Sequence, residues 1–243
     1  MRSDNVRLFK TVEHACGYYD DRVAQNWVID PVAPELASVY GSALSQGFRR
    51  AGGHVYRPTC LSCQACTPTR LPVSLFQPNR KQKRCIRANA DLAITNEPAG
   101  FSDEAFALYR SYMNSRHLGG GMDQTSRDDF SRFLYAPWSR TRFLMFRDRG
   151  ELLACAVTDV TSGGLSAVYT FYQPGASRRS LGVFAILTQI QWALREKLSH
   201  LYLGYWIEGH PKMHYKIEYR PIELLRNGQW VGFQSEMERD SGA

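Results

Sequence analysis

The chain has 243 residues, enough for one large domain or two small ones that fold without disulfides. Hydrophobic residues make up 44% of it, aromatic residues 12% and charged residues 22%, which excludes a disordered chain, a fibrous repeat and a disulfide-rich miniprotein. No stretch is apolar enough to span a bilayer, and the N-terminal residues lack the apolar core of a secretory signal. We therefore expect a cytoplasmic protein with no membrane partner, whose six cysteines are reduced or metal-bound.

The formal net charge of +7 comes from one segment. Nine Lys and Arg residues lie between Leu36 and Ala90, where there is no acidic residue, while the rest of the chain has 21 basic and 23 acidic residues. Phe48, Tyr56 and Phe76 are interleaved with these charges. Such a block predicts a polyanionic partner, of which a nucleic acid is the commonest. The alternative is a solvated basic surface.

Hydrophobic spacing predicts one helix in the N-terminal part of the chain. Leu36, Tyr40 and Leu44 recur at helical intervals, and Gly47 follows as a stop signal. Residues 48–90 are rich in Pro, Cys and Gly, which favours loops and short strands. The composition changes near residue 100. We therefore predict a basic cysteine-containing domain over residues 1–100 and a second domain over residues 101–243.

Regular helix and strand patterns fill the second domain. One helix begins after Ser102 and ends near residues 119–121, and another begins at Ser126. Strands are predicted over residues 142–147, 152–160, 165–172 and 201–207, a long helix over 180–196, a short helix over 211–218, and a hairpin at Asn227-Gly228. This order is α+β, and it resembles the acyltransferase core of the GCN5-related N-acetyltransferases.

In that fold the start of the central helix holds an anionic cofactor or substrate. The matching segment here is Arg178-Arg179-Ser180-Leu181-Gly182. Backbone N–H groups and two guanidinium groups at a helix start suit a phosphate. The segment therefore predicts an anion site at Arg178, Arg179 and Ser180; the alternative is that both arginines are exposed surface charge.

Three closely spaced thiols form the sharpest local motif. Cys60-x-x-Cys63-x-x-Cys66 has the spacing of three ligands to one zinc ion or one iron–sulfur cluster. The fourth ligand would be Cys16, His54 or Cys85. The alternative is a compact loop of reduced cysteines. No nucleotide-binding motif such as a P-loop or GxGxxG occurs in the chain.

An ordered set of short motifs identifies a family. In chain order they are Cys16-Gly-Tyr18, Gly47-Phe-Arg-Arg50, Tyr56-Arg-Pro58, the cysteine triplet, Asn79-Arg-Lys-Gln-Lys-Arg84, Tyr112-x-x-x-Arg116-His117, Ser166-Ala-Val-Tyr-Thr-Phe-Tyr172, Arg179-Ser-Leu-Gly182, Leu201-Tyr-Leu-Gly-Tyr-Trp-Ile207 and Lys212-Met-x-Tyr-Lys216. Together they resemble the bacterial aspartate/glutamate leucyltransferases, relatives of the eukaryotic arginyl-tRNA–protein transferases. The resemblance spans roughly residues 14–232.

The resemblance implies that the protein moves leucine from leucyl-tRNA onto proteins with an N-terminal Asp or Glu, with no cofactor required and no DNA partner. It assigns the basic segment to tRNA. The tRNA-binding residues would be Arg49, Arg50, Arg80, Lys81, Lys83, Arg178, Arg179 and Ser180. Eukaryotic relatives carry a Cys-x-x-Cys near the N-terminus that takes part in metal or cluster binding. Here Cys16 is followed by Tyr19 at the second position, so the conditional metal set is Cys16, Cys60, Cys63 and Cys66.

An aminoacyl-tRNA ester is already activated, so the enzyme has only to align the acceptor amine, stabilise the oxyanion and remove a proton. The candidates for these tasks are Tyr169, Tyr172, Tyr205, Glu208 and Tyr215. A positive charge must distinguish the acceptor's carboxylate from an amide of the same shape. The candidates for that task are Arg57, Arg84, Lys212, Lys216 and Arg220.

Two other functions remain open from the residues alone. One is an acyl-CoA-dependent N-acyltransferase with the same core, which would bind free CoA. The other is a non-catalytic, zinc-containing RNA-binding protein, which would form no peptide bond.

Overall fold

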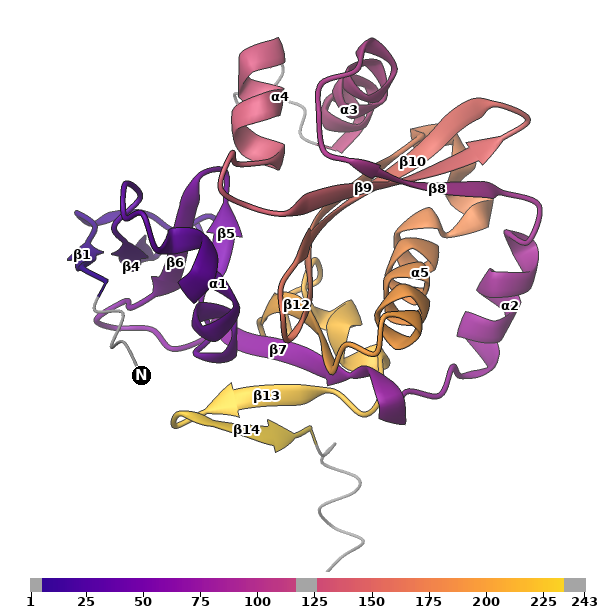
Figure 1. The fold of residues 1–243 in the computed structure, drawn as a ribbon. Coiled ribbons are helices and arrows are strands. Elements are labelled where there is room, and N and C mark those ends of the chain that lie inside the picture. The colour runs from indigo at the N-terminus through magenta and orange to yellow at the C-terminus, as the bar shows by residue number, and fades with distance from the viewer. Residues whose placement is uncertain (1–5, 117–125, 234–243) are drawn as a thin grey trace, which may run out of the picture.

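The computed structural model describes residues 6–116 and 126–233 (Figure 1). The N-terminal part is a four-stranded sheet in the order β1-β4-β6-β5, with a two-stranded ribbon, β2-β3, beside it. The strands are β1 (Leu8–Lys10), β2 (His14–Ala15), β3 (Val23–Ala24), β4 (Asn26–Ile29), β5 (Arg49–Ala51) and β6 (His54–Pro58). Strands β1 to β4 carry no clear alternating pattern, and the sequence did not predict them.

Helix α1 (Leu36–Ser45) packs on this small sheet, as the hydrophobic spacing predicts. Leu36, Tyr40 and Leu44 are buried in one cluster with Phe48 and other residues of the small sheet. Gly47 has a φ of +86°, a conformation that glycine adopts without strain, and it ends the helix as predicted.

The larger sheet has eight strands in the order β14-β13-β7-β12-β11-β10-β9-β8. Their bounds are β7 (Thr67–Pro72), β8 (Ala93–Pro98), β9 (Thr141–Asp148), β10 (Glu151–Val160), β11 (Gly164–Tyr172), β12 (His200–Trp206), β13 (Glu223–Arg226) and β14 (Gln229–Gly232). β7 pairs with both β12 and β13, and β8 pairs with β9. The backbone of residues 67–98 is therefore built into the same sheet as the C-terminal strands, and the division at residue 100 does not follow the sheet pairing.

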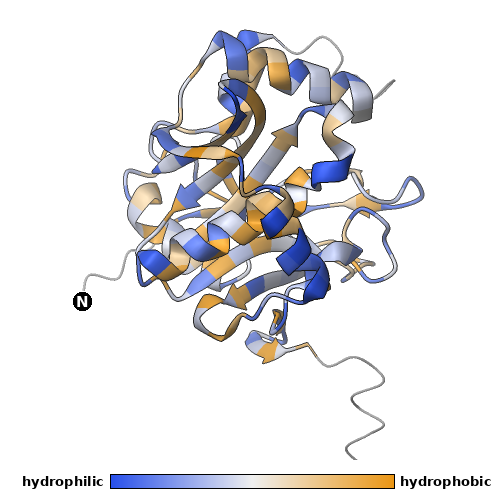
Figure 2. Ribbon diagram, turned by 90° about the vertical axis from the view of Figure 1, so that its right-hand side faces the viewer, coloured by the Kyte–Doolittle hydropathy of each residue, from blue (hydrophilic) through white to orange (hydrophobic). Residues whose placement is uncertain are grey.

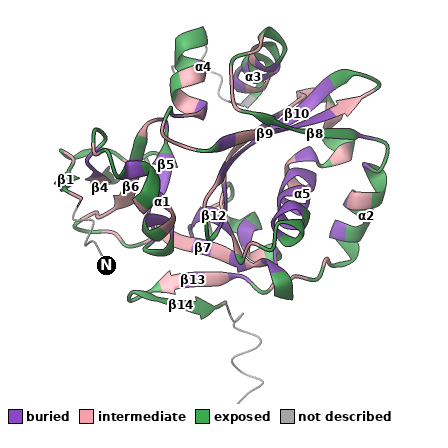
Figure 3. Ribbon diagram, in the orientation of Figure 1, coloured by how far each residue is buried: buried purple, intermediate pink, exposed green. Residues whose placement is uncertain are grey.

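Helices cover both faces of this sheet (Figure 1). Phe143 and Met145 of β9 pack with α3 (Asp103–Arg116) and α4 (Arg127–Leu134) in one buried cluster. Leu144 and Phe146, which point the other way, pack with α5 (Leu181–Arg195) in another. Figure 3 shows the buried residues of α5 facing the sheet, and the exposed outer face of α2 (Arg80–Ala88).

Helix α2 lies where the sequence analysis expected only loops and short strands, so that expectation was wrong. Asn79 caps it: its side chain accepts from the backbone N–H of Gln82, while the Gln82 side chain accepts from the N–H of Asn79. This reciprocal pair is a capping box with Asn and Gln in place of the usual Ser and Glu. Cys85 and Gln82 face inward, and the basic residues face outward.

Strands β11 and β12 separate after a short parallel pairing. They pair only from Gly164 with His200 to Ser166 with Tyr202, although β11 continues to Tyr172 and β12 to Trp206. The parallel connection between them is α5, as such a crossover requires. The backbone groups beyond Ser166 on the facing edges therefore need partners other than the neighbouring strand.

The remaining elements of the C-terminal part largely match the sequence. The three antiparallel strands, α3, α4, α5 and β12 occur where predicted. Asn227 and Gly228 both have positive φ, which confirms the type I′ hairpin. The short helix expected over 211–218 is reduced to the 3-10 helix η3 (His214–Glu218). Residues 119–121 and His117 lie outside the described residues. No helix in the described ranges is long and apolar enough to cross a membrane.

Candidate functional site

A cavity of about 470 Å³ opens where the starts of α2 and α5 meet η3. Lys81 and Arg84 of α2 and Arg178, just before α5, line it on the basic side. Val183, Tyr219 and Ala88 give it apolar walls, and Glu218 is its acidic lining residue. Figure 2 views the molecule from the side that carries α2, whose basic residues are exposed. The cavity therefore combines a cationic rim with an apolar interior.

The first turn of α5 is open toward this cavity. Ser180 precedes it with a left-handed φ of +50° and gives no side-chain hydrogen bond to the helix, and no acidic residue occurs in the first turn. The N-terminal N–H groups of a helix need acceptors, and an anion supplies them well. The start of α2 differs, because its own capping box already occupies it. The predicted anion site at Arg178 and Ser180 therefore lies in the cavity.

The predicted tRNA-binding residues fall into three environments. Arg80, Lys81 and Lys83 are exposed along α2. Arg179 lines the cavity but is held by two carboxylates, Asp91 at 2.8 Å and Asp148 at 3.1 Å. Arg49 and Arg50 are 8% and 5% exposed. Neither side chain lies on the exposed surface that carries the basic residues of α2, and their assignment to tRNA stays a prediction.

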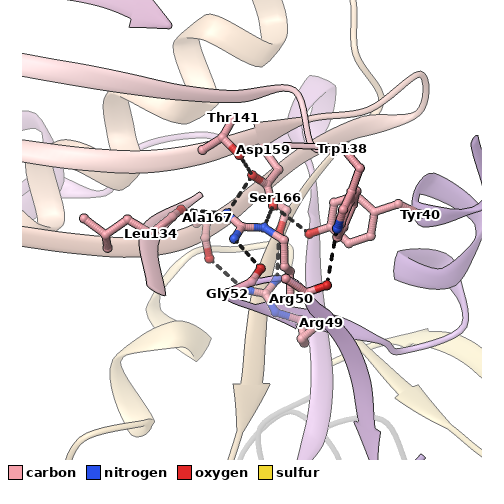
Figure 4. Close-up of polar contacts among 11 residues, drawn as sticks. Tyr40, Arg49, Arg50, Gly52, Leu134, Trp138, Thr141, Asp159, Ser166 and Ala167 are labelled. Carbon is pink, nitrogen blue, oxygen red and sulfur yellow. Dashed lines mark hydrogen bonds and ion pairs between the residues drawn. The ribbon is translucent and has the colours of Figure 1, made fainter. Parts of the chain in front are cut away.

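Arg50 belongs to a buried network that joins the two sheets (Figure 4). Its Nε and Nη2 donate to Asp159 at 2.6 and 2.9 Å, and neither side chain is exposed to solvent. Tyr40 and Thr141 donate to the same carboxylate at 2.9 and 2.6 Å. Each oxygen of Asp159 thus accepts two hydrogen bonds, which is the full capacity of a carboxylate. The network fixes β5 against β10.

Arg49 points to the other side, into the gap between β11 and β12. Burial raises the pKa of the nearby phenols Tyr18, Tyr56 and Tyr205, and the Arg49 charge opposes that rise. Burial and, to a smaller extent, the Arg49 charge lower the pKa of Lys216 from 10.5 to about 7. The Lys216 ammonium donates to the Tyr205 carbonyl and to Met213 Sδ.

The predicted catalytic side chains are not gathered at one point. The Tyr205 hydroxyl donates to the Gly47 carbonyl at 3.0 Å, which ties β12 to the N-terminal part. Tyr169 is half-buried among aromatic rings, and its hydroxyl contacts Met113 Sδ at 3.5 Å. Glu208 is exposed just after β12.

Tyr172 and Tyr215 lie nearer the cavity. Tyr215 lines it, and Lys216 Nζ is 5.7 Å from the centre of the Tyr215 ring. A Cβ added to Gly182 in the first turn of α5 would lie 3.5 Å from the Tyr172 ring. These two tyrosines are therefore the predicted catalytic residues that border the open helix start.

The predicted acceptor-binding residues are also dispersed. Arg84 lines the cavity. Arg57 stacks on the Phe48 ring at 4.9 Å, and Lys212 is exposed. Arg220 donates to the carbonyls of Ile217 and Phe233. Only Lys216 of the five is buried beside Arg49.

The four candidate metal ligands lie in one neighbourhood but do not converge. Burial and the charges of Cys16, Cys60 and Cys63 raise the pKa of Cys66 to about 12. A backbone N–H from Ala65 lowers the pKa of Cys63, and Arg22 Nη1 donates to its sulfur at 3.3 Å. Within residues 6–116 and 126–233, no three His, Cys, Asp or Glu side chains are placed to hold a metal ion. As placed, the thiols do not fit a metal, and no chemical step is assigned to one; the metal site stays a prediction.

Sequence reasoning missed the placement of Arg49 between β11 and β12 and the pairing of Arg50 with Asp159. The two partners are 109 residues apart, and nothing local marks them. Gly204 was the available signal for Arg49, because a glycine inside a strand often marks a close approach of another group. Asn79 and Gln82 were the available signal for α2.

The cationic rim at the start of α5 suits an anionic ligand. Two family models match the chain. The model described as arginine-tRNA-protein transferase, C terminus, matches residues 104–226, and the one described as arginine-tRNA-protein transferase, N terminus, matches residues 14–84. The chain belongs to the arginine-tRNA-protein transferase family, in agreement with the resemblance in its motifs.

Curated relatives narrow the class further. A protein of Stenotrophomonas maltophilia (strain R551-3) named aspartate/glutamate leucyltransferase is 51% identical over 98% of this chain and 97% of its own length. A protein of the same name from Xanthomonas campestris pv. campestris (strain B100) is 52% identical over 94% of this chain and 93% of its own. The one from Pseudomonas fluorescens (strain SBW25) is 49% identical over 93% and 96%.

Two solved structures are similar to part of the chain. The C-terminal domain of a lysylphosphatidylglycerol synthetase from Agrobacterium fabrum is 15% identical, with a TM-score of 0.48 over 72% of this chain and 52% of that one. The L-PGS structure from Bacillus licheniformis is 12% identical, with a TM-score of 0.44 over 73% of this chain and 51% of that one. This chain thus spans about half the length of each.

Proposed function

We propose that this protein transfers leucine from leucyl-tRNA to an N-terminal Asp or Glu of acceptor proteins, which marks them for degradation by the N-degron pathway. The name shared by its curated relatives supports this activity. The structural observation that carries it is the cavity at the open start of α5, with its cationic rim and apolar walls.

The tRNA occupies the exposed face of α2 and the cavity. Arg80 and Lys83 contact the phosphate backbone, while Lys81, Arg84 and Arg178 lead the 3′ end toward α5. The free N–H groups of the first turn of α5 bind a phosphate near that end. The leucyl side chain needs only apolar walls, whereas an arginyl group in such a pocket would need a paired carboxylate. Glu218 is the one acidic residue among the described residues that line this cavity, and the basic lining residues outnumber it, which favours a leucyl group over an arginyl group.

The reaction needs no further activation. The acceptor's α-amine nitrogen attacks the carbonyl carbon of the leucyl ester, a C–N bond forms, and the C–O bond to the terminal ribose breaks. The amine loses its proton, and the released ribose hydroxyl takes one up. Tyr172 and Tyr215 border the helix start and are the proposed donors to the oxyanion.

We further propose that strands β9 to β12 and α5 form a core like that of the GCN5-related N-acetyltransferases. Three antiparallel strands, a crossover helix and a parallel strand that diverges from its neighbour support this assignment.

The deciding experiment incubates the purified protein with labelled leucyl-tRNA or arginyl-tRNA at equal concentration and with peptides that differ only in residue one. We expect leucine on Asp and Glu peptides only. Arginine as the better donor would overturn the leucyl assignment. Transfer from an acyl-CoA without tRNA would favour an acyl-CoA-dependent enzyme, and RNA binding without a product would favour a binding protein.

The cysteine prediction has its own test. If Cys16, Cys60, Cys63 and Cys66 gather around a metal, anaerobically purified protein carries about one zinc ion or cluster per chain, and Cys63→Ser loses both the metal and much stability. Cys155→Ser is the control for metal content alone, because Cys155 belongs to a buried apolar cluster of the larger sheet that contains none of these four cysteines. Metal-free protein with full activity and stability would contradict the prediction.

A further inference from the structure

The guanidinium of Arg49 lies in the opening between β11 and β12. Its Nη1 donates to Ser166 Oγ at 3.2 Å and its Nη2 to the Ala167 carbonyl at 2.6 Å, just where β11 leaves β12. On the other side, a Cβ added to Gly204 of β12 would lie 3.3 Å from Nη2, so the glycine permits this approach. Arg49 belongs to the N-terminal sheet, but its charged guanidinium thus lies between two strands of the C-terminal sheet.

That charge has no carboxylate partner in the described parts of the chain. The ion pairs found there include neither Arg49 nor Lys216. Asp159 lies opposite Ser166 on β10, but Arg50, Tyr40 and Thr141 already fill both of its oxygens. The ionisable groups near Arg49 include the phenols of Tyr18, Tyr56 and Tyr205, whose pKa values are raised by burial, so they supply no negative charge.

Arg49 and Lys216 are therefore two buried basic groups that have no carboxylate counter-charge in the described parts of the chain, and the charge of Arg49 acts on Lys216. Arg49 is 8% exposed and Lys216 is 5% exposed. A guanidinium has five N–H donors and an ammonium three, and each group uses two of them within the protein. An uncompensated buried charge is costly, and a ligand that supplies the opposite charge removes that cost.

We propose that Arg49, together with Lys216, binds the side-chain carboxylate of the acceptor's N-terminal Asp or Glu, and that Arg49 determines the specificity for acidic residues. This inference rests on the proposed function. Tyr215 lies next to Lys216 and lines the cavity, so a carboxylate held at the cation pair leaves the adjacent α-amine beside the leucyl ester. The N–H group of an Asn or Gln amide would face the N–H donors of Arg49 and Lys216, which cannot accept a hydrogen bond.

The test compares kcat/KM for peptides beginning with Asp and with Asn, at saturating leucyl-tRNA. Arg49→Gln keeps a polar amide at this position but removes the charge. We expect the Asp/Asn ratio to fall by roughly 30-fold or more, with the affinity for leucyl-tRNA unchanged. Arg195→Gln is the matched control, because Arg195 is exposed at the end of α5. Its ratio should equal that of the unmodified protein.

A folded Arg49→Gln protein that keeps the ratio, or that loses activity equally on both peptides, would overturn the proposal in favour of a purely structural role. If the variant does not fold, the unmodified protein decides. The Nε–H resonance of Arg49 should shift on addition of an Asp-initiated peptide and not of an Asn-initiated one. No shift with the Asp peptide at saturation would overturn the proposal.

The proposed function fails differently. In that case the unmodified protein transfers no leucine from leucyl-tRNA to any peptide. When the unmodified protein is active and selective but Arg49→Gln keeps its selectivity, only the assignment of Arg49 is lost.

Discussion

Helix α2 and strand β5 belong to the same basic block of sequence, but the fold puts them to opposite uses. The basic side chains of α2 point outward along an exposed face and into the rim of the cavity. Arg49 and Arg50 of β5 point inward, and each leaves the N-terminal sheet to enter the C-terminal part. A like-charged segment therefore supplies both a surface for a polyanion and an internal framework.

Within β5 itself, the two neighbours differ again. Arg50 has a carboxylate that matches it completely, and Arg49 has only a hydroxyl and a carbonyl. A paired buried charge holds structure together, whereas an unpaired one is available to a ligand. Adjacent residues in a strand point to opposite faces, so one strand can present a paired charge on one face and an unpaired charge on the other.

Removal of Asp159 should have the largest effect on stability. Asp159→Ala leaves the Arg50 guanidinium buried without its counter-charge and leaves Tyr40 and Thr141 without an acceptor. We expect the free energy of unfolding, measured with urea, to fall by about 3–5 kcal/mol. Arg132→Ala, which breaks an exposed pair with Asp129, should cause no measurable change. A loss below about 1 kcal/mol for Asp159→Ala would mean that the network does not join the two sheets.

The role of the exposed basic residues of α2 is tested by the salt dependence of tRNA binding. Replacement of Arg80, Lys81, Lys83 and Arg84 by Ala should weaken tRNA binding and lower the slope of log K against log salt by roughly 3, because each lost phosphate contact removes about 0.7–0.9. The folding stability should stay close to that of the unmodified protein. Arg132→Ala with Arg195→Ala is the control for general loss of charge. An unchanged slope would show that α2 is only a solvated surface.

The sequence predicts the elements whose patterns are local. Residues of α5 and of β9 to β11 alternate or recur at the correct period, and Asn227-Gly228 specifies its own turn. Helix α2 was missed because its sequence is mostly basic and shows no apolar stripe at helical spacing. Its capping box, formed by Asn79 and Gln82, was visible in the sequence. The pairing of Arg50 with Asp159 joins two segments that are distant in the sequence. A local sequence pattern carries no information about such a contact, so it could not show which arginine is paired. The cationic rim was predictable from composition; the cation pair of Arg49 and Lys216 was not.

Lys216 gives the smallest and most specific effect, which appears as a dependence of stability on pH. Burial holds its pKa at about 7 in the folded protein, against 10.5 in the unfolded chain. Between these values the unfolded chain binds one proton more, so the stability of the folded state rises with pH, by up to about 1.4 kcal/mol per unit. Cys66, with a pKa raised to about 12, remains a thiol across this window.

Lys216→Met should remove this dependence. We expect the unmodified protein to gain about 1 kcal/mol per pH unit relative to the variant between pH 7.5 and 9.5, and almost nothing below about pH 6, where Lys216 is protonated in both states. Urea unfolding at a series of pH values measures the difference. Lys212→Met is the control, because Lys212 is exposed four residues earlier. Parallel pH profiles for the unmodified protein and Lys216→Met would show that Lys216 keeps its ordinary pKa. The cation pair would then be too well solvated to need a carboxylate from the acceptor.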